Sequence, residues 1–205
     1  MTTITTVSGR EINLRYINPE LINVDDIAHS LSRMRRFNGA TAVGYSVASH
    51  ALHVSDLVRR MGGTLSAQLA ALHHDSHEYL IGDMVSPMKA LIDLMCVNAY
   101  LIIEGRIQRN VLDALGIRTA FVSNTKLIHR ADMVALATER RDLMPTSLDA
   151  EWPCLIGVTP DAVDIRHRAA KDDDAWADAF ISRDHELRTR MAELMEYPMR
   201  AEATQ

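Results

Sequence analysis

Apolar and polar residues alternate over the first 14 residues of the chain. Ile4 and Val7 come before a serine–glycine pair at positions 8 and 9, and Ile12 and Leu14 come after it. Alternation on both sides of a turn-forming pair is typical of two strands joined by a tight turn. The pattern therefore predicts a short β-hairpin within residues 1–22.

From residue 23 onward the apolar positions follow a helical period instead. Asn23, with Asp26 three residues later, is a suitable N-cap, and Gly39 would close the helix that it begins. Further helices are predicted from Ser46 to the glycines at 62 and 63, and over residues 65–77. Their apolar stripes are Ile27, Leu31 and Met34 in the first, Val47, Ala51, Val54 and Val58 in the second, and Leu69, Ala70 and Leu72 in the third.

Longer helical patterns occupy the second half of the chain. One covers residues 87–115 and ends before Gly116, and another covers residues 125–144 and ends before Pro145. Residues 145–160 hold three prolines and a glycine and predict a loop, and residues 173–196 predict an amphipathic closing helix. Strand signals are otherwise sparse, so the expected class is all-α with a short N-terminal hairpin.

Length and composition fit one globular domain. The chain has 205 residues, of which 47% are hydrophobic and 24% charged. This is enough for one sizeable core, and a second domain would be cramped. We expect a single domain over residues 1–205, divided into the hairpin (1–22), a core (23–144) and a C-terminal loop with the closing helix (145–205).

Charge and cysteine content exclude several classes of partner. A net charge of −5 argues against a surface that coats a nucleic-acid polymer. Cys96 and Cys154 lie far apart, which indicates neither a disulfide scaffold nor a thiolate zinc site. The sequence shows no basic-then-apolar leader and no 18-residue apolar run, so we expect a cytoplasmic protein without a membrane partner.

The most informative chemistry is an adjacent imidazole and carboxylate, His74-Asp75, in a largely apolar stretch. These two ligand types together suit a borderline divalent cation such as Zn, Co or Mn, and Mg tolerates the carboxylate. On the predicted helix Glu78 would project over the same face, where it could handle a proton beside the metal. The dipeptide alone is a weak signal, because it occurs by chance in many proteins.

Residues on either side strengthen the signal. His50 precedes the pair and Asp132 follows it, both within predicted helices. This ordered series, with a Gly-Asp pair at 82–83 and Pro-Met-Lys at 87–89, resembles the HD-domain phosphohydrolases, most closely their nucleotidase branch, over roughly residues 27–144. The resemblance implies a compact HD-domain helical bundle in which His50, His74, Asp75 and Asp132 hold one divalent metal ion.

The resemblance also implies roles for residues around the metal. Glu78 would orient or deprotonate the attacking water, and Asp83 would assist the leaving oxygen of the sugar. Arg36 would grip a phosphate bidentately while Phe37 packs against the base or sugar, and Lys89 would neutralise phosphate oxygens. The aromatic here is Phe, where related nucleotidases often have Trp.

Each of these residues also has a plainer interpretation. A single histidine such as His50 is more often a satisfied or surface residue, Asp132 could be an ordinary helix charge, and Lys89 an exposed lysine. Yet the apolar flank of Asp132 predicts a buried carboxylate, which needs a partner. Two groups are expected to be structural or solvated rather than part of the site: the histidines His53, His73, His77 and His129, and the charged run of residues 139–142.

Taken together, the sequence predicts metal-dependent hydrolysis of the 5'-phosphoester of a deoxynucleotide at the alpha phosphorus. The leading hypothesis is a dNTP triphosphohydrolase acting on dATP, similar to enzymes of phages, and the alternative is a 5'-deoxynucleotidase acting on dNMPs. A second alternative is a non-catalytic nucleotide-sensing or assembly protein that uses the helix of residues 173–196 as its interface. The expected partners are a small deoxynucleotide and further copies of the chain, as a dimer or hexamer.

Overall fold

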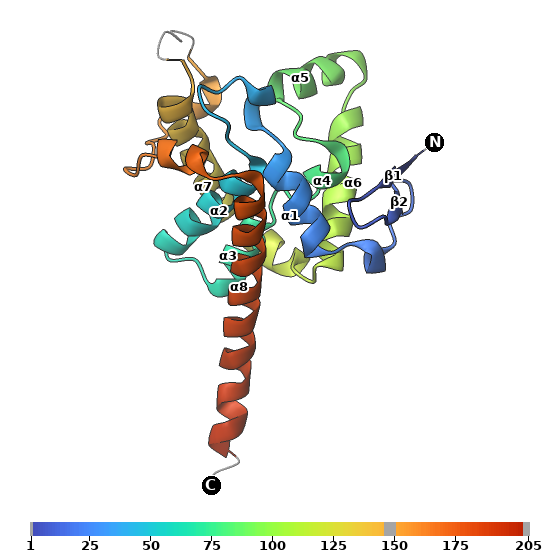
Figure 1. The fold of residues 1–205 in the computed structure, drawn as a ribbon, viewed down its shortest axis with the longest axis vertical. Helices are drawn as coiled ribbons and strands as arrows, with labels where there is room; N and C mark the ends of the chain where they lie inside the picture. Colours follow the sequence, from blue (N-terminus) through green and yellow to red (C-terminus); the bar gives the residue numbers. More distant parts are fainter. Residues whose placement is uncertain (1, 146–150, 203–205) are drawn as a thin grey trace.

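The computed structural model describes residues 2–145 and 151–202, and these are mostly helical (Figure 1). Within them a two-stranded hairpin is followed by eight α-helices, which confirms the predicted class. The elements are β1 (Thr3–Thr5), β2 (Glu11–Asn13), α1 (Val24–Arg33), α2 (Val47–Arg60), α3 (Leu65–Leu72), α4 (Glu78–Ile81), α5 (Ser86–Met95), α6 (Ala99–Ala114), α7 (Arg118–Leu143) and α8 (Asp173–Glu202).

The N-terminal hairpin is antiparallel, with Ile4 opposite Ile12. Ile12 is fully buried, so one side of the hairpin joins the core. The turn is tied to α1 by Asp26, whose carboxylate accepts hydrogen bonds from the backbone N–H of Ser8 (3.1 Å) and from its hydroxyl (2.7 Å). The hairpin therefore caps the helical body.

The predicted N-cap Asn23 and the predicted helix start at Ser46 are confirmed, but the end of the first helix is not. The Asn23 side chain accepts from the Asp26 N–H at the start of α1, and Ser46 does the same for Ser49 at the start of α2. The first helix ends at Arg33, six residues before Gly39. The chain is extended beyond that point and pairs with the segment that precedes α2.

The third predicted helix is wrong at its C-terminal end. It stops at Leu72, and residues 73–77 form successive tight turns in which the Ser76 N–H bonds to the His73 carbonyl and the Glu78 N–H to the Asp75 carbonyl. The periodic apolar residues end at Leu72, and the buried residues of the turns that follow are polar. Glu78 instead begins the short helix α4.

Later helix boundaries also differ from the prediction. The region of residues 87–115 is two helices, α5 and α6, because Asn98 between them adopts a left-handed backbone conformation (φ 59°). Helix α7 begins at Arg118 rather than near Thr125, whose hydroxyl bonds back to the Phe121 carbonyl inside the helix. The closing helix α8 runs to Glu202. Residues 146–150 of the predicted loop lie outside the described residues.

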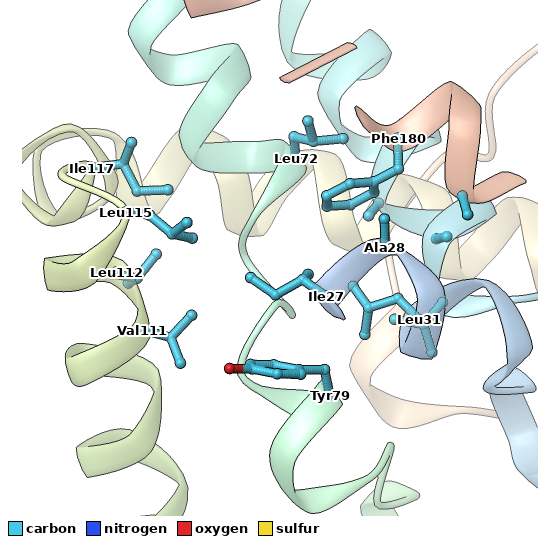
Figure 2. Packing of buried hydrophobic residues seen from close by; sticks show 14 of the residues in the cluster. Ile27, Ala28, Leu31, Leu72, Tyr79, Val111, Leu112, Leu115, Ile117 and Phe180 are labelled. Atoms are coloured by element: carbon cyan, nitrogen blue, oxygen red, sulfur yellow. The ribbon is translucent and has the colours of Figure 1, made fainter. Parts of the chain in front are cut away.

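The main core lies where α1, α3, α6 and α8 meet (Figure 2). Fully buried side chains fill it from one side, among them Ile27, Leu31, Leu72 and Phe180. Val111 of α6 packs from the opposite side. A second apolar cluster joins α2, α3 and α7: Val54, Leu57, Val58, Ala67, Ala70, Ala71, Ile128, Ala131 and Ala135. Because each buried aliphatic side chain contributes roughly 1.5–3 kcal/mol, these two clusters fix the helices that carry the candidate site.

The C-terminal helix α8 extends well past the body of the molecule (Figure 1). Its first half packs against α1 and α3, and its far end projects away from them. Among the described residues there is no helix with both the length and the apolar character needed to cross a membrane.

Candidate metal centre

Three segments distant in sequence bring His50, His74, Asp75 and Asp132 together. His50 lies in the first turn of α2, His74 and Asp75 in the turns between α3 and α4, and Asp132 in α7. The apolar cluster between α2, α3 and α7 holds these segments in place. His50 is fully buried, whereas the Asp132 side chain keeps 27% exposure, more than its apolar flank predicts, and so marks the solvent side of the centre.

Donor atoms of His50, His74 and Asp75 are spaced as the ligands of one cation would be, and Asp132 lies beside the two imidazoles. Nε2 of His50 lies 3.2 Å from Nε2 of His74, 3.6 Å from Oδ2 of Asp75 and 3.2 Å from Oδ1 of Asp132. Nε2 of His74 lies 3.0 Å from the Asp75 oxygen and 3.9 Å from the Asp132 oxygen. Metal–ligand bonds of about 2.0–2.2 Å place neighbouring ligand atoms roughly 3–3.5 Å apart. His50, His74 and Asp75 thus form a buried group that could hold a metal ion.

The hydrogen bonds of the two imidazoles leave a lone pair on each Nε2. His74 Nδ1 lies 2.8 Å from the carbonyl of Ala71, which only accepts, so Nδ1 carries the proton. His50 Nδ1 donates to the Glu139 carboxylate at 2.6 Å. The two Nε2 atoms face each other at 3.2 Å, so either a proton or a cation must lie between them. The donor set therefore fits a borderline divalent cation.

The electrostatics of the cluster also attract a cation. Burial and the nearby Arg36 charge would lower the pKa of His50, but the Glu139 and Asp132 carboxylates outweigh them and raise that pKa to about 9. Burial likewise opposes charge on His74, yet Asp75 raises the pKa of its imidazole. Burial would raise the pKa of Asp75, but the two histidines hold it well below its usual range. Three carboxylates thus create a strongly negative potential at the imidazoles.

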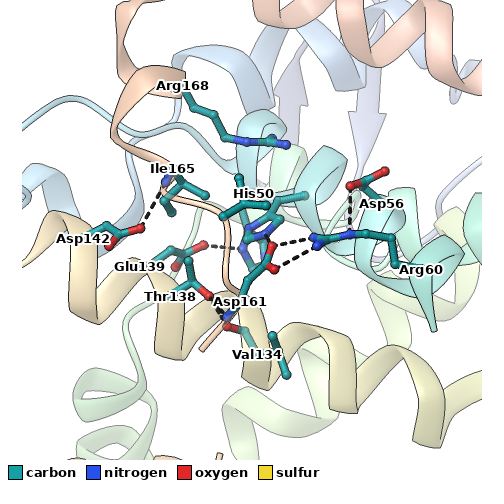
Figure 3. A network of polar contacts seen from close by, with 12 residues as sticks. His50, Asp56, Arg60, Val134, Thr138, Glu139, Asp142, Asp161, Ile165 and Arg168 are labelled. Atoms are coloured by element: carbon teal, nitrogen blue, oxygen red, sulfur yellow. Dashed lines mark hydrogen bonds and ion pairs between the residues drawn. The ribbon is translucent and has the colours of Figure 1, made fainter. Parts of the chain in front are cut away.

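Glu139 is a residue of this site that the sequence interpretation missed. The charged run of residues 139–142 predicts a solvated face, but the Glu139 side chain is fully buried. One oxygen accepts from His50 (Figure 3). The other oxygen accepts from Arg36 Nε at 2.9 Å. The signal that could have revealed it is its position two helical turns after Asp132, on the same side of α7. A carboxylate behind a metal-ligating imidazole fixes the ring and its tautomer.

Arg36, the predicted phosphate-binding residue, lies against the centre. The backbone N–H of Arg36 bonds to the Tyr45 carbonyl (3.0 Å), in the extended pairing that precedes α2. Its side chain is only 12% exposed, with Nη1 4.0 Å from Asp75 Oδ2. Burial opposes the charge, but Glu139 and Asp75 raise the pKa of the guanidinium above its ordinary value. Arg36 is therefore a permanent cation held beside the metal ligands.

Glu78 and Asp83 lie in the same electrostatic environment. The prediction that Glu78 shares a helical face with His74 and Asp75 is wrong, because residues 73–77 are turns. Glu78 is nevertheless buried, with only 5% exposure, and lies close enough to Asp75 for that carboxylate to affect its pKa. Burial, reinforced by Asp75 and Asp83, raises the pKa of Glu78 well above normal, and burial also raises the pKa of Asp83. Oε2 of Glu78 is buried without a hydrogen-bond partner among the described residues. Such an atom requires a partner from outside the protein, such as a water or substrate.

Lys89 lies on α5 and is held by Glu104 of α6. The ammonium Nζ lies 2.7 Å from Oε1 of Glu104 and 5.6 Å from the centre of the Tyr100 ring. Burial would lower the pKa of Lys89, but Glu104 raises it, so the lysine stays charged. Its charge reaches both Glu78 and Asp75. It is one third exposed and so neither a core residue nor a fully solvated one.

Phe37 lies beside Arg36 in an unusual backbone conformation. Its φ is 57°, a left-handed value that is uncommon for a bulky residue. The Arg36 guanidinium lies 5.3 Å from the Phe37 ring centre, and the ring of Trp152 lies 5.9 Å away. Two aromatic rings from distant segments of the chain therefore pack together beside Arg36. Strained conformations of this kind cluster at ligand sites.

The remaining histidines differ in their environments. His73 is fully buried, with Nδ1 2.8 Å from the Ser76 hydroxyl and Nε2 2.8 Å from the Asp184 carboxylate of α8. His53 bonds to Asp161, which also receives two hydrogen bonds from Arg60 in the network that borders His50 (Figure 3). The other two are His77, buried 3.6 Å from Glu104, and His129, exposed on α7. His73 therefore braces the turn that carries the next residue, His74.

Comparison with known proteins gives no matching family model. Two bacterial proteins are similar along most of the chain. Uncharacterized protein YfdR of Escherichia coli (strain K12) is 35% identical over 160 residues, which covers 77% of this chain and 81% of YfdR. Uncharacterized protein RCAP_rcc00048 of Rhodobacter capsulatus is 34% identical over 170 residues, which covers 80% of this chain and 84% of that protein. Neither name specifies an activity.

Proposed function

We propose that this chain, which belongs to the same family as YfdR and RCAP_rcc00048, is a metal-dependent phosphohydrolase of the HD-domain kind. Its reaction is hydrolysis of the 5'-phosphoester of a deoxynucleotide at the alpha phosphorus. The leading substrate is dATP, which would give deoxynucleoside and triphosphate. His50, His74, Asp75 and Asp132 would hold one divalent cation.

One observation carries the proposal: two imidazole lone pairs and two carboxylate oxygens meet within 3.0–3.9 Å of the two Nε2 atoms. Nδ1 of each ring donates elsewhere, so both Nε2 atoms are directed at the carboxylates, and a cation can take the place of the proton that the raised pKa of His50 would otherwise keep there. When bound, a divalent cation lowers the pKa of water and polarises a phosphoryl oxygen. The orphaned Glu78 oxygen beside Asp75 gives the site a proton acceptor as well as a binding set.

The residues around the cation divide the work of hydrolysis. Water attacks the alpha phosphorus, Glu78 takes a proton from that water, and the P–O5' bond breaks. Asp83 gives its proton to the departing O5' atom, a role that suits a carboxyl whose pKa is raised by burial. Arg36 and Lys89 neutralise the phosphate oxygens, and Arg36 is oriented for this by its hydrogen bond to Glu139.

Phe37 and Trp152 would receive the nucleoside. Their tilted rings lie next to the Arg36 side chain, so a nucleotide with its phosphate at Arg36 could rest its base or sugar on an aromatic surface. The left-handed backbone at Phe37 and Asn38 is then the cost of turning that ring toward the site.

The charge of the site favours a second candidate substrate, a dNMP. The cations that act on Glu78 are Arg36 and Lys89, and each already faces a carboxylate, Glu139 or Glu104. That amount of positive charge suits one phosphate group rather than three. A 5'-deoxynucleotidase that releases inorganic phosphate is therefore the alternative to the triphosphohydrolase.

The experiment compares the wild-type protein with His74→Ala and with His129→Ala, which removes an exposed histidine of α7 as a matched control. Bound metal is measured by elemental analysis, and the products from each dNTP and dNMP are separated by anion-exchange chromatography. We expect one metal per chain and turnover in the wild type and the control, and neither in His74→Ala. Tripolyphosphate identifies the triphosphohydrolase, and orthophosphate from dNMPs identifies the nucleotidase. A metal-loaded wild type that is inert toward every nucleotide would sink the hydrolase proposal and favour a sensor or assembly protein.

A further inference from the structure

We propose that the outer face of the α5–α6 hairpin is the surface on which a second copy of this chain docks. The α5–α6 face is defined by eight large apolar residues that are exposed in the single chain: Met88, Leu91, Leu94, Met95, Val97, Leu101, Ile102 and Ile103. This inference is independent of the proposed function.

The polarity of the hairpin is inverted relative to an ordinary surface hairpin. Near the bend its charged side chains, Lys89 and Asp93 of α5 and Glu104 of α6, are partly buried, and Lys89 pairs with Glu104; the exposed charges Arg106, Arg109 and Asp113 lie further along α6. Its large apolar side chains point outward instead, with Met88, Leu91 and Met95 on one helical stripe of α5. No residue of α5, all of which is described, is buried in the core. The apolar residues of α5 therefore contribute little to the core of the single chain.

The exposed area is that of an interface rather than of a free surface. The eight side chains are between 45% and 84% exposed. Exposed apolar residues on a monomer are usually scattered singly, whereas these eight follow one another along two connected helices. A stable protein–protein interface buries about 800 Å² on each partner, and large apolar side chains exposed to this extent suit its centre.

The charge distribution favours a second copy over other occupants. In a two-fold symmetric dimer each face meets itself, so any exposed charge near the axis would lie beside a like charge. The exposed residues between positions 86 and 103 carry no charge. Each chain has a net charge of −5, so two copies repel except where they meet through an uncharged face. An anionic bilayer would instead require a basic excess around the apolar residues, and the Lys89 charge is already paired with Glu104.

The hairpin connects the docking face to the candidate metal centre. Lys89 and Glu104 lie on its inner side, and the Lys89 charge acts on Glu78 and Asp75. A second copy packed on the outer side would hold α5 against α6, because α5 has no residue buried in the core of its own chain. The dimer would thereby fix the position of Lys89.

The test is the mass of the intact protein in solution, measured by sedimentation equilibrium at micromolar concentration. We expect the wild type to have twice the 22.9 kDa of one chain, and the double variant Leu94→Glu with Leu101→Glu to have the mass of one chain. The matched control, Val122→Glu with Ile156→Glu, changes two apolar residues of similar exposure away from the hairpin and should remain a dimer. Circular dichroism verifies that all variants are folded, and Val97→Glu at the bend between the helices serves if the double variant is not.

Cys96 lies exposed between Met95 and Val97 and provides a second measurement. In a Cys154→Ser background, a short bismaleimide should link two chains through Cys96, and the double variant should prevent the link. A monomeric wild type, or a double variant that keeps the wild-type mass or cross-link, would overturn the proposal. So would a monomeric wild type that binds phosphatidylglycerol vesicles through this face.

Discussion

Glu139 gives the sharpest test of how the candidate metal centre is held. Its two carboxylate oxygens accept one hydrogen bond each, from His50 Nδ1 at 2.6 Å and Arg36 Nε at 2.9 Å. Glu139→Gln keeps the shape but replaces one acceptor by an NH₂ donor, so one of the two N–H groups loses its partner. Losing a hydrogen bond between charged groups costs about 1.5–3 kcal/mol.

The expected effect is on metal affinity. Removing the hydrogen-bond partner of a metal-ligating histidine typically weakens metal binding by about 10–100-fold. This equals about 1.4–2.7 kcal/mol, in agreement with the cost of the lost hydrogen bond. We therefore expect Glu139→Gln to bind Co²⁺ or Zn²⁺ at least tenfold more weakly than the wild type while remaining folded.

The assay is competition for the metal with a chromophoric chelator. Glu193→Gln, which makes the same substitution at an exposed position of α8, is the matched control and should match the wild type. His74→Ala gives the baseline without a centre. If Glu139→Gln holds the metal within twofold of the wild type, the carboxylate is only structural and the assignment of the His50 tautomer is wrong.

Three further predictions concern catalysis, pH and backbone space. Glu78→Gln should retain metal but lose about 10²–10⁴-fold in turnover, measured by product release, because only its proton-accepting ability is removed. Burial lowers the pKa of His53 to about 4, partly opposed by its hydrogen bond to Asp161, so on acidification the unfolded chain takes up the proton first. The associated stabilisation is complete above about pH 6.5 and is lost as the pH falls to about 4, by up to about 3 kcal/mol. Urea unfolding at several pH values should show this loss in the wild type and a smaller one in His53→Gln. Gly63→Ala would place a Cβ 2.5 Å from a side-chain carbon of Val58 and should destabilise by about 1–3 kcal/mol. Gly105→Ala meets nothing within 4 Å in α6 and should stabilise by roughly 0.5–1 kcal/mol in the same urea assay.

Each of these has a clear contrary result. Loss of metal together with turnover in Glu78→Gln would make that residue a ligand rather than a proton acceptor. A stability of His53→Gln that falls as steeply as the wild type between pH 6.5 and 4 would assign the acid sensitivity to other groups. If Gly63→Ala and Gly105→Ala are equally stable, the turn after α2 can shift to accommodate the added Cβ without loss of stability.

The sequence predicts well those features that depend on neighbouring residues. The caps at Asn23 and Ser46 and the stripe of α2 are local, and the structure confirms them. The helix boundary at Leu72 was missed because nothing in the polar residues that follow, 73–77, marks the end of a helix. Their conformation depends instead on partners far away in the sequence. The tie between His73 and Asp184 spans 111 positions, and no local pattern contains it.

The candidate site shows the same limit. Adjacent His74 and Asp75 are visible in the sequence, and their convergence with His50 and Asp132 follows from the resemblance to a known family. Glu139 was not found, because its neighbours are charged and a charged run on a helix usually faces water. Glu139 can be buried because Arg36, about 100 residues earlier in the sequence, lies beside it and neutralises the charge of its carboxylate. The identity of a buried ion pair is thus decided by tertiary contacts alone.

The bond between His73 and Asp184 has a consequence for biosynthesis. Asp184 belongs to α8, 111 positions after His73, so the turn that presents His74 and Asp75 lacks its brace until α8 has left the ribosome. A nascent or C-terminally truncated chain would therefore expose the ligands without organising them, and capture of the ion becomes a late event in maturation.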